Sequence, residues 1–123
     1  MTRSNQQAAV RAYEVAWNET DADRRMSALE LAWADDSVYV DDDVPEGLVG
    51  REALAEYIAE EHEGDPGLVI TTTRALVILG DRGWLQWIAR SPAGSESGGT
   101  DFIEFAADGR IARLTDFLDD DAS

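Results

Sequence analysis

The sequence contains no cysteine and no lysine, and only one histidine among its 123 residues. Without cysteine there can be no disulfide framework, no thiolate nucleophile and no zinc–thiolate site. The ten basic side chains are all arginines, and 26 acidic side chains outnumber them to give a formal net charge of −16. So negative a protein repels phosphate backbones and anionic lipids. The composition therefore excludes nucleic acid and membrane surfaces as partners.

Long hydrophobic runs are also absent, although 44% of the residues are hydrophobic. No apolar stretch approaches the ~20 residues needed to cross a bilayer, and the first ten residues lack the apolar centre of a signal peptide. We therefore expect a cytoplasmic protein. There is no glycine-rich phosphate loop, and the acidic run 41–43 lacks the ligand spacing of a cation site. We expect neither a metal nor another cofactor.

The hydrophobic spacing predicts helices first and strands afterwards. The predicted helices cover about 5–19, 23–34 and 51–62. The predicted strands cover 37–41, 68–79, 84–90, 100–106 and 110–118. Ser4 and Gln7 have the spacing of a capping box for the first helix, and Asp108-Gly109 is a strong turn signal for a closing hairpin. Helices gathered before a strand meander indicate an α+β fold, and a curved sheet around helices leaves a cavity of the kind that holds ligands.

Three segments carry a family resemblance. They are WADDSVYVD at 33–41, GREAL at 50–54, and GTDF at 99–102 running into DGRI at 108–111. Together they resemble the nuclear transport factor 2-like superfamily, specifically its SnoaL-like branch. The resemblance implies one SnoaL-like domain over 1–123, with a core of about 6–119 and an acidic tail at 119–123. It also implies a cone-shaped, cystatin-like barrel in which a curved, mainly antiparallel sheet wraps around three N-terminal helices. Superfamily members are commonly homodimers, and they include isomerases, cyclases, hydrolases and binding proteins.

Three positions match the ketosteroid isomerase pattern within this resemblance. The resemblance implies that Asp41 takes a proton next to a carbonyl group, while Tyr13 and a protonated Asp101 stabilise the enolate oxygen. The residues themselves are compatible with these roles. Strand alternation puts Tyr39 and Asp41 on the same face. Aspartate is disfavoured inside a strand, and a buried Asp101 would have a raised pKa.

Each candidate also has a structural explanation. Asp41 could be a solvated carboxylate at a strand end, and Asp101 could be a structural acid bonded to backbone or to an arginine. Tyr13 could be a core aromatic, because helical spacing with Val10 and Trp17 already accounts for it. The lone histidine, His62, falls at a helix end, where a solvated position is expected.

Aromatic side chains are expected to form the wall of the pocket. Trp84 and Trp87 differ in strand parity, so only one of them can face the pocket. We choose Trp87 and assign the other to a dimer interface. The candidate ligand-binding residues are Trp17, Tyr39, Tyr57, Trp87 and Phe117.

Two classes of function remain open. The first is a cofactor-independent acid–base enzyme, an isomerase- or cyclase-like isomerase or lyase, that acts on a small hydrophobic carbonyl compound. The second is a non-catalytic module for binding a small molecule or for dimerisation. A weaker alternative, an epoxide hydrolase, needs two aspartates bridged by an arginine. Asp116 falls at the position of one of these aspartates. The arginine–aspartate pair expected on the strand 84–90 is missing, because Ile88 and Arg90 fall near those positions. The expected partners are a small hydrophobic molecule and a second copy of the chain.

Overall fold

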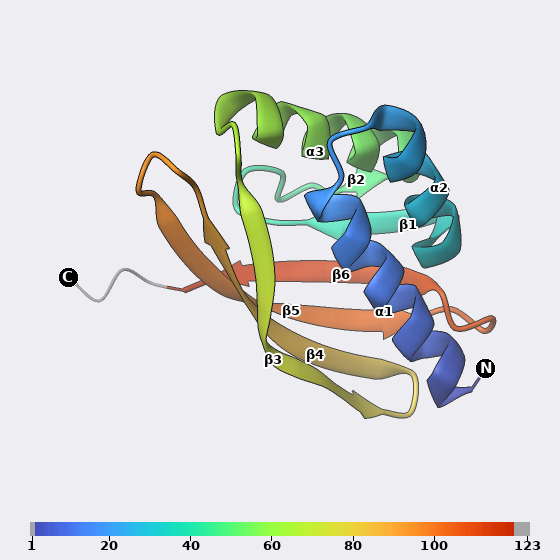
Figure 1. Cartoon of the computed structure of the whole chain (residues 1–123). Coiled ribbons are helices and arrows are strands. Elements are labelled where there is room, and N and C mark those ends of the chain that lie inside the picture. Colours follow the sequence, from blue (N-terminus) through green and yellow to red (C-terminus); the bar gives the residue numbers. More distant parts are fainter. Residues whose placement is uncertain (1, 120–123) are drawn as a thin grey trace.

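The computed structural model describes residues 2–119, and in it three helices pack on one face of a six-stranded sheet (Figure 1). The helices are α1 (Arg3–Asn18), α2 (Ala22–Ala32) and α3 (Arg51–Gly64). The strands are β1 (Trp33–Val40), β2 (Leu48–Val49), β3 (Val69–Leu79), β4 (Arg82–Arg90), β5 (Glu96–Phe105) and β6 (Ile111–Leu118). The predicted α+β class is confirmed. The predicted acidic tail lies outside the described residues except for Asp119. In residues 2–119 no helix has the length and apolar character required to cross a membrane.

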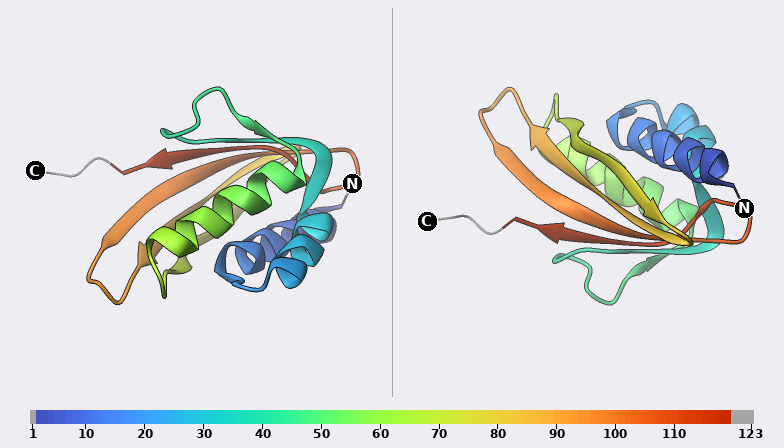
Figure 2. Two further views of the ribbon diagram at one scale, coloured as in Figure 1. Left: turned by 90° about the horizontal axis from the view of Figure 1, so that it is seen from above. Right: turned by 90° about the horizontal axis from the view of Figure 1, so that it is seen from below.

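The sheet has the strand order β2-β1-β6-β5-β4-β3. Strands β3 to β6 form an antiparallel meander, and β1 joins it by pairing parallel to β6. Figure 2 shows that the sheet curves and that the helices all lie on one side of it. Helix α1 contacts β3, whereas α3 contacts β1 and β2. The helices therefore cover the two edges of the curved sheet and enclose the space between them.

The helix boundaries differ from the prediction at two places. The prediction that Ser4 and Gln7 form a capping box is wrong. Thr2 caps α1 instead, and its side chain accepts a hydrogen bond from the backbone N–H of Asn5 at 3.1 Å. Helix α2 ends at Ala32, so Trp33 begins β1 instead of ending the helix. The Trp33 side chain is fully buried, and its burial explains why its hydrophobic spacing resembled a helical position.

Two strand segments were also missed. Strand β2 pairs with Val38 and Tyr39, and it directly follows the acidic turn 42–47, where no strand was predicted. Strand β5 begins at Glu96, although the segment 92–99 reads as a glycine- and serine-rich loop. Its first residues pair with the end of β4, for example Glu96 with Arg90. The neighbouring strand thus supplies partners that local composition does not indicate.

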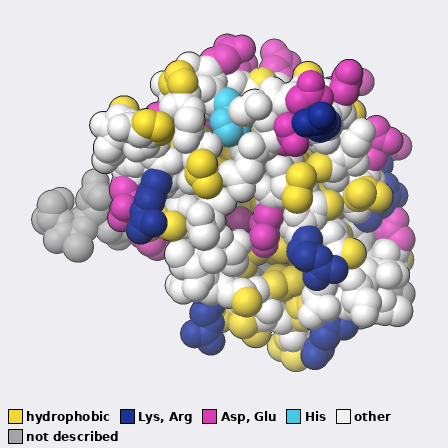
Figure 3. Space-filling view, in the orientation of Figure 1, with side chains coloured by type: hydrophobic (Ala, Val, Ile, Leu, Met, Phe, Trp, Pro, Cys, Tyr) yellow, Lys and Arg dark blue, Asp and Glu magenta, His cyan; other side chains and the backbone are white. Residues whose placement is uncertain are grey.

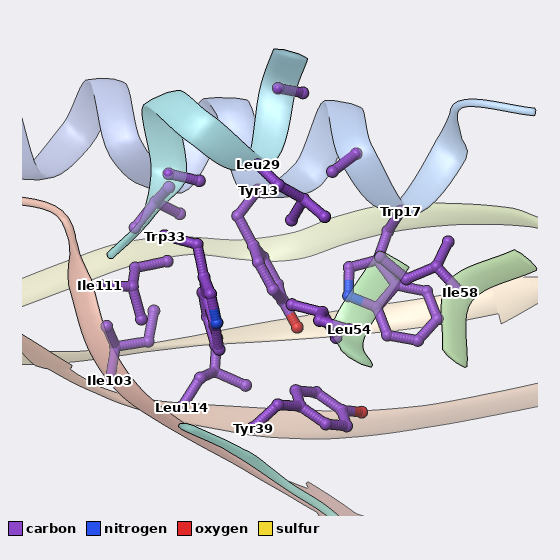
Figure 4. Close-up of a cluster of buried hydrophobic side chains, with 14 of the residues drawn as sticks. Tyr13, Trp17, Leu29, Trp33, Tyr39, Leu54, Ile58, Ile103, Ile111 and Leu114 are labelled. Atoms are coloured by element: carbon purple, nitrogen blue, oxygen red, sulfur yellow. The ribbon is translucent and has the colours of Figure 1, made fainter. Parts of the chain in front are cut away.

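The core lies between the helices and the concave face of the sheet (Figure 4). Tyr13 of α1 stacks on Trp33 with ring centroids 5.7 Å apart. Leu29, Leu54 and Leu114 come from two helices and β6, and none of them is exposed to solvent. Burying one such side chain stabilises a protein by about 1.5–3 kcal/mol. This core holds α1 and α3 above the sheet and so determines where the pocket opens.

Candidate functional site

A cavity of about 270 Å³ opens between the concave face of the sheet and the helices α1 and α3. Its apolar lining includes Leu85 and Ala89 of β4 and Leu118 of β6. Five aromatic side chains line it, namely Tyr13, Trp17, Tyr39, Tyr57 and Trp87. Seven acidic side chains line it as well, namely Glu14, Asp41, Asp43, Glu61, Asp65, Asp101 and Asp116. The cavity is slightly smaller than the 300–1,000 Å³ typical of ligand pockets, so it suits a small molecule.

Asp41 follows β1, and four donors surround its carboxylate. The hydroxyls of Tyr39 and Tyr57 donate to Asp41 Oδ2 at 2.8 and 2.6 Å. The backbone N–H groups of Asp43 and Val44 donate to Asp41 Oδ1 at 2.9 and 3.1 Å. An ionised carboxylate can accept about four hydrogen bonds, so Asp41 is held in one orientation by the turn that follows it and by two phenols.

Asp101 and Asp116 form a second carboxyl pair on neighbouring strands. They stand directly opposite each other on β5 and β6. The ring N–H of Trp87 lies between them and donates to Asp101 Oδ1 at 3.1 Å and to Asp116 Oδ1 at 2.9 Å. Asp101 is only 5% exposed. One indole N–H therefore fixes both carboxyl groups at the inner end of the pocket.

Asp101 has the more strongly raised pKa of this pair. Burial raises the pKa of Asp101 well above its ordinary value, and the charge of Asp116 and a hydrogen bond to it raise this pKa further. Burial also raises the pKa of Asp116, but the hydrogen bonds from Asp101 and Trp87 lower it. Two carboxyl groups this close cannot both ionise easily, and the directions of their pKa shifts favour a proton on Asp101 with Asp116 as the acceptor.

Tyr39 connects the two carboxyl centres. Its hydroxyl donates to Asp41 Oδ2 at 2.8 Å and lies 3.5 Å from Asp116 Oδ2. Burial, followed by the charges of Tyr13, Asp116 and Asp41, raises the pKa of Tyr39. The phenol stays neutral for this reason and remains a donor. It can therefore donate to either carboxylate.

Tyr13 belongs to both the core and the pocket. Its ring stacks on Trp33, as its helical spacing suggested, and it also lines the cavity. Burial raises the pKa of Tyr13 well above its ordinary value, and the charges of Asp101 and Asp116 raise it further. The hydroxyl is thus a neutral donor, and the effect of both carboxyl charges on its pKa puts it near the carboxyl pair.

Most of the predicted site residues meet in this cavity. Tyr13, Asp41 and Asp101 line it together, although they come from α1, the end of β1, and β5. The aromatic candidates Trp17, Tyr39, Tyr57 and Trp87 line it as well.

The prediction that Phe117 lines the pocket is wrong, because its side chain is 58% exposed and does not line the cavity. Strand alternation turns Asp116 and Leu118 inward and therefore turns Phe117 to the outer face of the sheet. Trp84 also lies outside the pocket, where Arg74 stacks over its ring at 5.4 Å.

The prediction that His62 is solvated at its helix end is also wrong, because its side chain is half-buried. Its Nε2 lies 2.7 Å from the backbone oxygen of Trp17, and this hydrogen bond joins the end of α3 to α1. The histidine thus helps to keep the two helices that flank the pocket together.

The epoxide hydrolase arrangement is not formed in the described part of the chain. No arginine lines the pocket, and the N–H of Trp87 occupies the place between Asp101 and Asp116. Arg90 is exposed and pairs with Glu96 at 2.9 Å. Within residues 2–119 no three His, Asp or Glu side chains are grouped to hold a metal ion.

Sequence reasoning missed the pairing of Asp116 with Asp101. A two-residue turn at Asp108-Gly109 pairs Ala107 with Arg110 and would already put Asp101 opposite Asp116. In the structure Ala106 pairs with Arg110 instead, and a β-bulge between Glu104 and Phe105 restores the register in which Asp116 lies opposite Asp101. The pairing was therefore implicit in the predicted turn, although the bulge that preserves it has no clear sequence signal.

The fold and the pocket define a protein of the nuclear transport factor 2-like superfamily. The chain belongs to the SnoaL-like domain family, whose family model matches residues 9–114. No curated protein matches it.

Several solved structures are similar. A SnoaL-like family protein from Agrobacterium tumefaciens, provisionally assigned as an isomerase, is 29% identical, with a TM-score of 0.83 over 95% of this chain and 99% of its own. A provisionally assigned ketosteroid isomerase from Kribbella flavida is 21% identical, with a TM-score of 0.74 over 98% of this chain and 82% of its own. A protein of ketosteroid isomerase-like fold from Catenulispora acidiphila, in complex with trimethylamine, is 18% identical, with a TM-score of 0.69 over 89% of this chain and 83% of its own. The last two share the fold with this chain.

Proposed function

We propose that the protein is a cofactor-independent acid–base enzyme that moves a proton next to the carbonyl group of a small molecule. The observation that carries this proposal is the presence of a carboxylate, Asp41, and a neutral carboxylic acid, Asp101, in the lining of one small pocket. A base and an acid whose environments differ are what proton transfer on carbon requires.

The proposed step needs no group from outside the chain. Asp41 takes a proton from the carbon next to the carbonyl, and the electron pair of that C–H bond forms a carbon–carbon double bond. The π electrons of the carbonyl then move onto its oxygen, where Tyr13 and Asp101 donate hydrogen bonds to the developing negative charge. In a β,γ-unsaturated carbonyl compound this enolate is a dienolate, and return of the proton from Asp41 to its γ-carbon, with the double bond left between the α- and β-carbons, completes an isomerisation.

Tyr39 has a positioning role in this step. All four acceptor places of Asp41 are occupied, so one hydrogen bond must be given up when the carboxylate takes a proton. The Tyr39 hydroxyl has a second acceptor in Asp116 Oδ2. It can turn to Asp116 as Asp41 becomes protonated and turn back when the proton leaves.

The size of the cavity limits the substrate. A volume of about 270 Å³ lies just below the usual range for ligand pockets, which favours a small substrate. The Agrobacterium relative, with its provisional isomerase assignment, supports the reaction class. The Catenulispora relative, which binds trimethylamine, supports a small-molecule pocket in this fold.

The experiment is deuterium exchange at the carbon next to the carbonyl of small ketones, followed by proton NMR in D₂O. We expect exchange faster than in buffer. We expect Asp41→Asn to slow it by about 10²–10⁴-fold, the usual contribution of a general base, and Asp101→Asn to slow it as well. Glu56→Gln, on an exposed part of α3, is the control and should leave the rate unchanged. Exchange no faster than in buffer, or a full rate in Asp41→Asn, would reject the proposal.

A non-catalytic binding role is the second candidate. It is favoured by the four hydrogen bonds that the Asp41 carboxylate already accepts from Tyr39, Tyr57 and two backbone N–H groups, because they occupy all of its acceptor positions. This candidate predicts that small ketones bind with measurable affinity, that no exchange occurs, and that Asp41→Asn alters binding only.

We also propose that the chain forms a homodimer through the outer face of its sheet. Val77, Trp84 and Phe102 are cross-strand neighbours on β3, β4 and β5, and Phe117 lies on the same face of β6. Phe102 is 39% exposed and Phe117 is 58% exposed. Aromatic residues gathered on an exposed sheet face are typical of a protein interface.

A further inference from the structure

The lining of the pocket carries negative charge without a counter-charge. Asp41 and Asp116 lie inside it, and Asp43, Glu61 and Asp65 line it as well, whereas no arginine or histidine of residues 2–119 does. Acidic side chains also gather on the side of the molecule formed by α2 and α3 (Figure 3). Even with Asp101 protonated, an anion entering this cavity would be repelled and a cation attracted.

The acidic side chains that line the pocket repel one another, and this repulsion adds to burial in raising the pKa of Glu61. Burial raises the pKa of Glu61, and the charges of Asp43 and Asp41 raise it further. The carboxyl groups whose charges act on the Tyr57 hydroxyl are again Asp41, Glu61 and Asp43. This cluster therefore surrounds Tyr57, and a positive group placed there would relieve its mutual repulsion.

The same part of the pocket is aromatic. The rings of Trp17, Tyr39 and Tyr57 are mutual neighbours with centroids 5.5–6.2 Å apart. Trp17 and Tyr57 meet edge to face at 88°. Aromatic faces attract ammonium groups through the ring quadrupole, and they do so most strongly where water is excluded.

The inner end of the pocket offers a second buried donor. The ring nitrogen of Trp17 meets no hydrogen bond of ordinary geometry among the described residues, and Trp17 is only 9% exposed. The nitrogen is on the side of the ring that faces the Tyr13 hydroxyl (Figure 4), and its weaker interaction with that hydroxyl lowers the pKa of Tyr13. A ligand oxygen placed beside Tyr13 would give this N–H a better acceptor.

We propose that the substrate is a small carbonyl compound that also carries a cationic amine. This inference rests on the proposed acid–base function. The ammonium group lies against the ring of Tyr57, between Glu61 and Asp43. The carbonyl oxygen points toward Tyr13, Trp17 and Asp101. The positive charge of the substrate then offsets the enolate charge that develops close to Asp116.

The test compares two ketones of the same shape. One is trimethyl(2-oxopropyl)ammonium, and the other is 4,4-dimethylpentan-2-one, in which a carbon atom replaces the positive nitrogen. Their dissociation constants are measured with the wild-type chain by NMR titration in 150 mM salt, where the Debye length of about 8 Å screens distant charges. We expect the cationic ketone to bind at least tenfold more tightly. Equal or weaker binding of the cation, or no binding of either ketone at millimolar concentration, would overturn the proposal.

Two variants locate the cation. Glu61→Gln removes one negative charge from the pocket lining, and Glu56→Gln removes one from the exposed part of the same helix. We expect Glu61→Gln to weaken binding of the cationic ketone severalfold and to leave the neutral ketone unaffected. Glu56→Gln should change neither affinity. Equal effects of the two variants would mean that only the net charge of the protein attracts the cation, which would overturn the placement.

The two proposals fail separately. If the cationic ketone binds tightly but its protons do not exchange, the acid–base function is wrong and the cationic ligand stands. If the two ketones exchange and bind equally well, the function stands and the preference for a cation is wrong.

Discussion

Removal of the charge of Asp116 is expected to lower the affinity of Asp101 for its proton. Both carboxyl groups accept a hydrogen bond from the same nitrogen of Trp87, at 3.1 and 2.9 Å, so their charges lie within about 6 Å of each other. Two unit charges at that separation repel by about 3 kcal/mol at an effective dielectric constant near 20. A loss of this repulsion in Asp116→Asn corresponds to about a hundredfold weaker proton binding by Asp101.

The assay is a titration of the carboxyl carbon of Asp101 by NMR, with Asp101→Asn to assign the signal. In Asp116→Asn the pKa of Asp101 should fall but stay above its ordinary value, because burial is the largest cause of the shift. Glu104→Gln removes a charge from the exposed side of the same strand and should change the titration much less. The reasoning is refuted if Asp101 titrates at the ordinary value of about 3.9 in the unmodified protein, or if Asp116→Asn leaves its titration unchanged.

Four further predictions follow from the structure. Asp101 and Asp116 have raised pKa values in the folded state. Their protonation therefore stabilises the fold fully below about pH 4, and this stabilisation is lost as the pH rises through the folded-state pKa. Calorimetry should show a melting temperature that rises as the pH is lowered from 8 toward 5, and Asp101→Asn combined with Asp116→Asn should flatten that rise. Gly99→Ala should destabilise the chain by about 1–3 kcal/mol in urea unfolding and shift the NMR signal of the Trp87 ring N–H. An added Cβ at Gly99 would lie 2.8 Å from that ring and 2.6 Å from the carbonyl oxygen of Phe117; an unchanged signal would contradict this. Light scattering at micromolar concentration should give twice the 13.5 kDa of one chain, and a value for one chain would end the dimer proposal. Because the net charge is −16, the melting temperature should rise clearly between low and molar salt, and a flat response would show that charge repulsion contributes little.

The parts of the fold that depend on local pattern were predictable. Apolar residues at helical spacing located three helices to within a few residues. The turn at Asp108-Gly109 was also correct, and Gly109 adopts the positive φ of 93° that favours glycine there. Alternation within a single strand placed Tyr39 and Asp41 on one face, and both line the cavity.

The wrong placement of Phe117 has a physical reason. A strand pattern is normally interpreted with its apolar residues turned toward the interior. In this part of β6 the interior is an acidic pocket, so Asp116 points inward and the aromatic residue beside it points outward. The alternation was visible in the sequence, but its direction depends on what the other elements place on each face.

The sequence by itself determined the α+β class, the family resemblance, and the residue types available for acid–base chemistry. Only the tertiary structure decided which of them meet. The bulge at Glu104 and Phe105 keeps Asp116 opposite Asp101 although the turn closes one residue earlier, and the packing of α3 over the sheet brings the Tyr57 hydroxyl to Asp41. Register shifts and helix docking depend on contacts between residues that are far apart in the chain, and a local pattern does not contain that information.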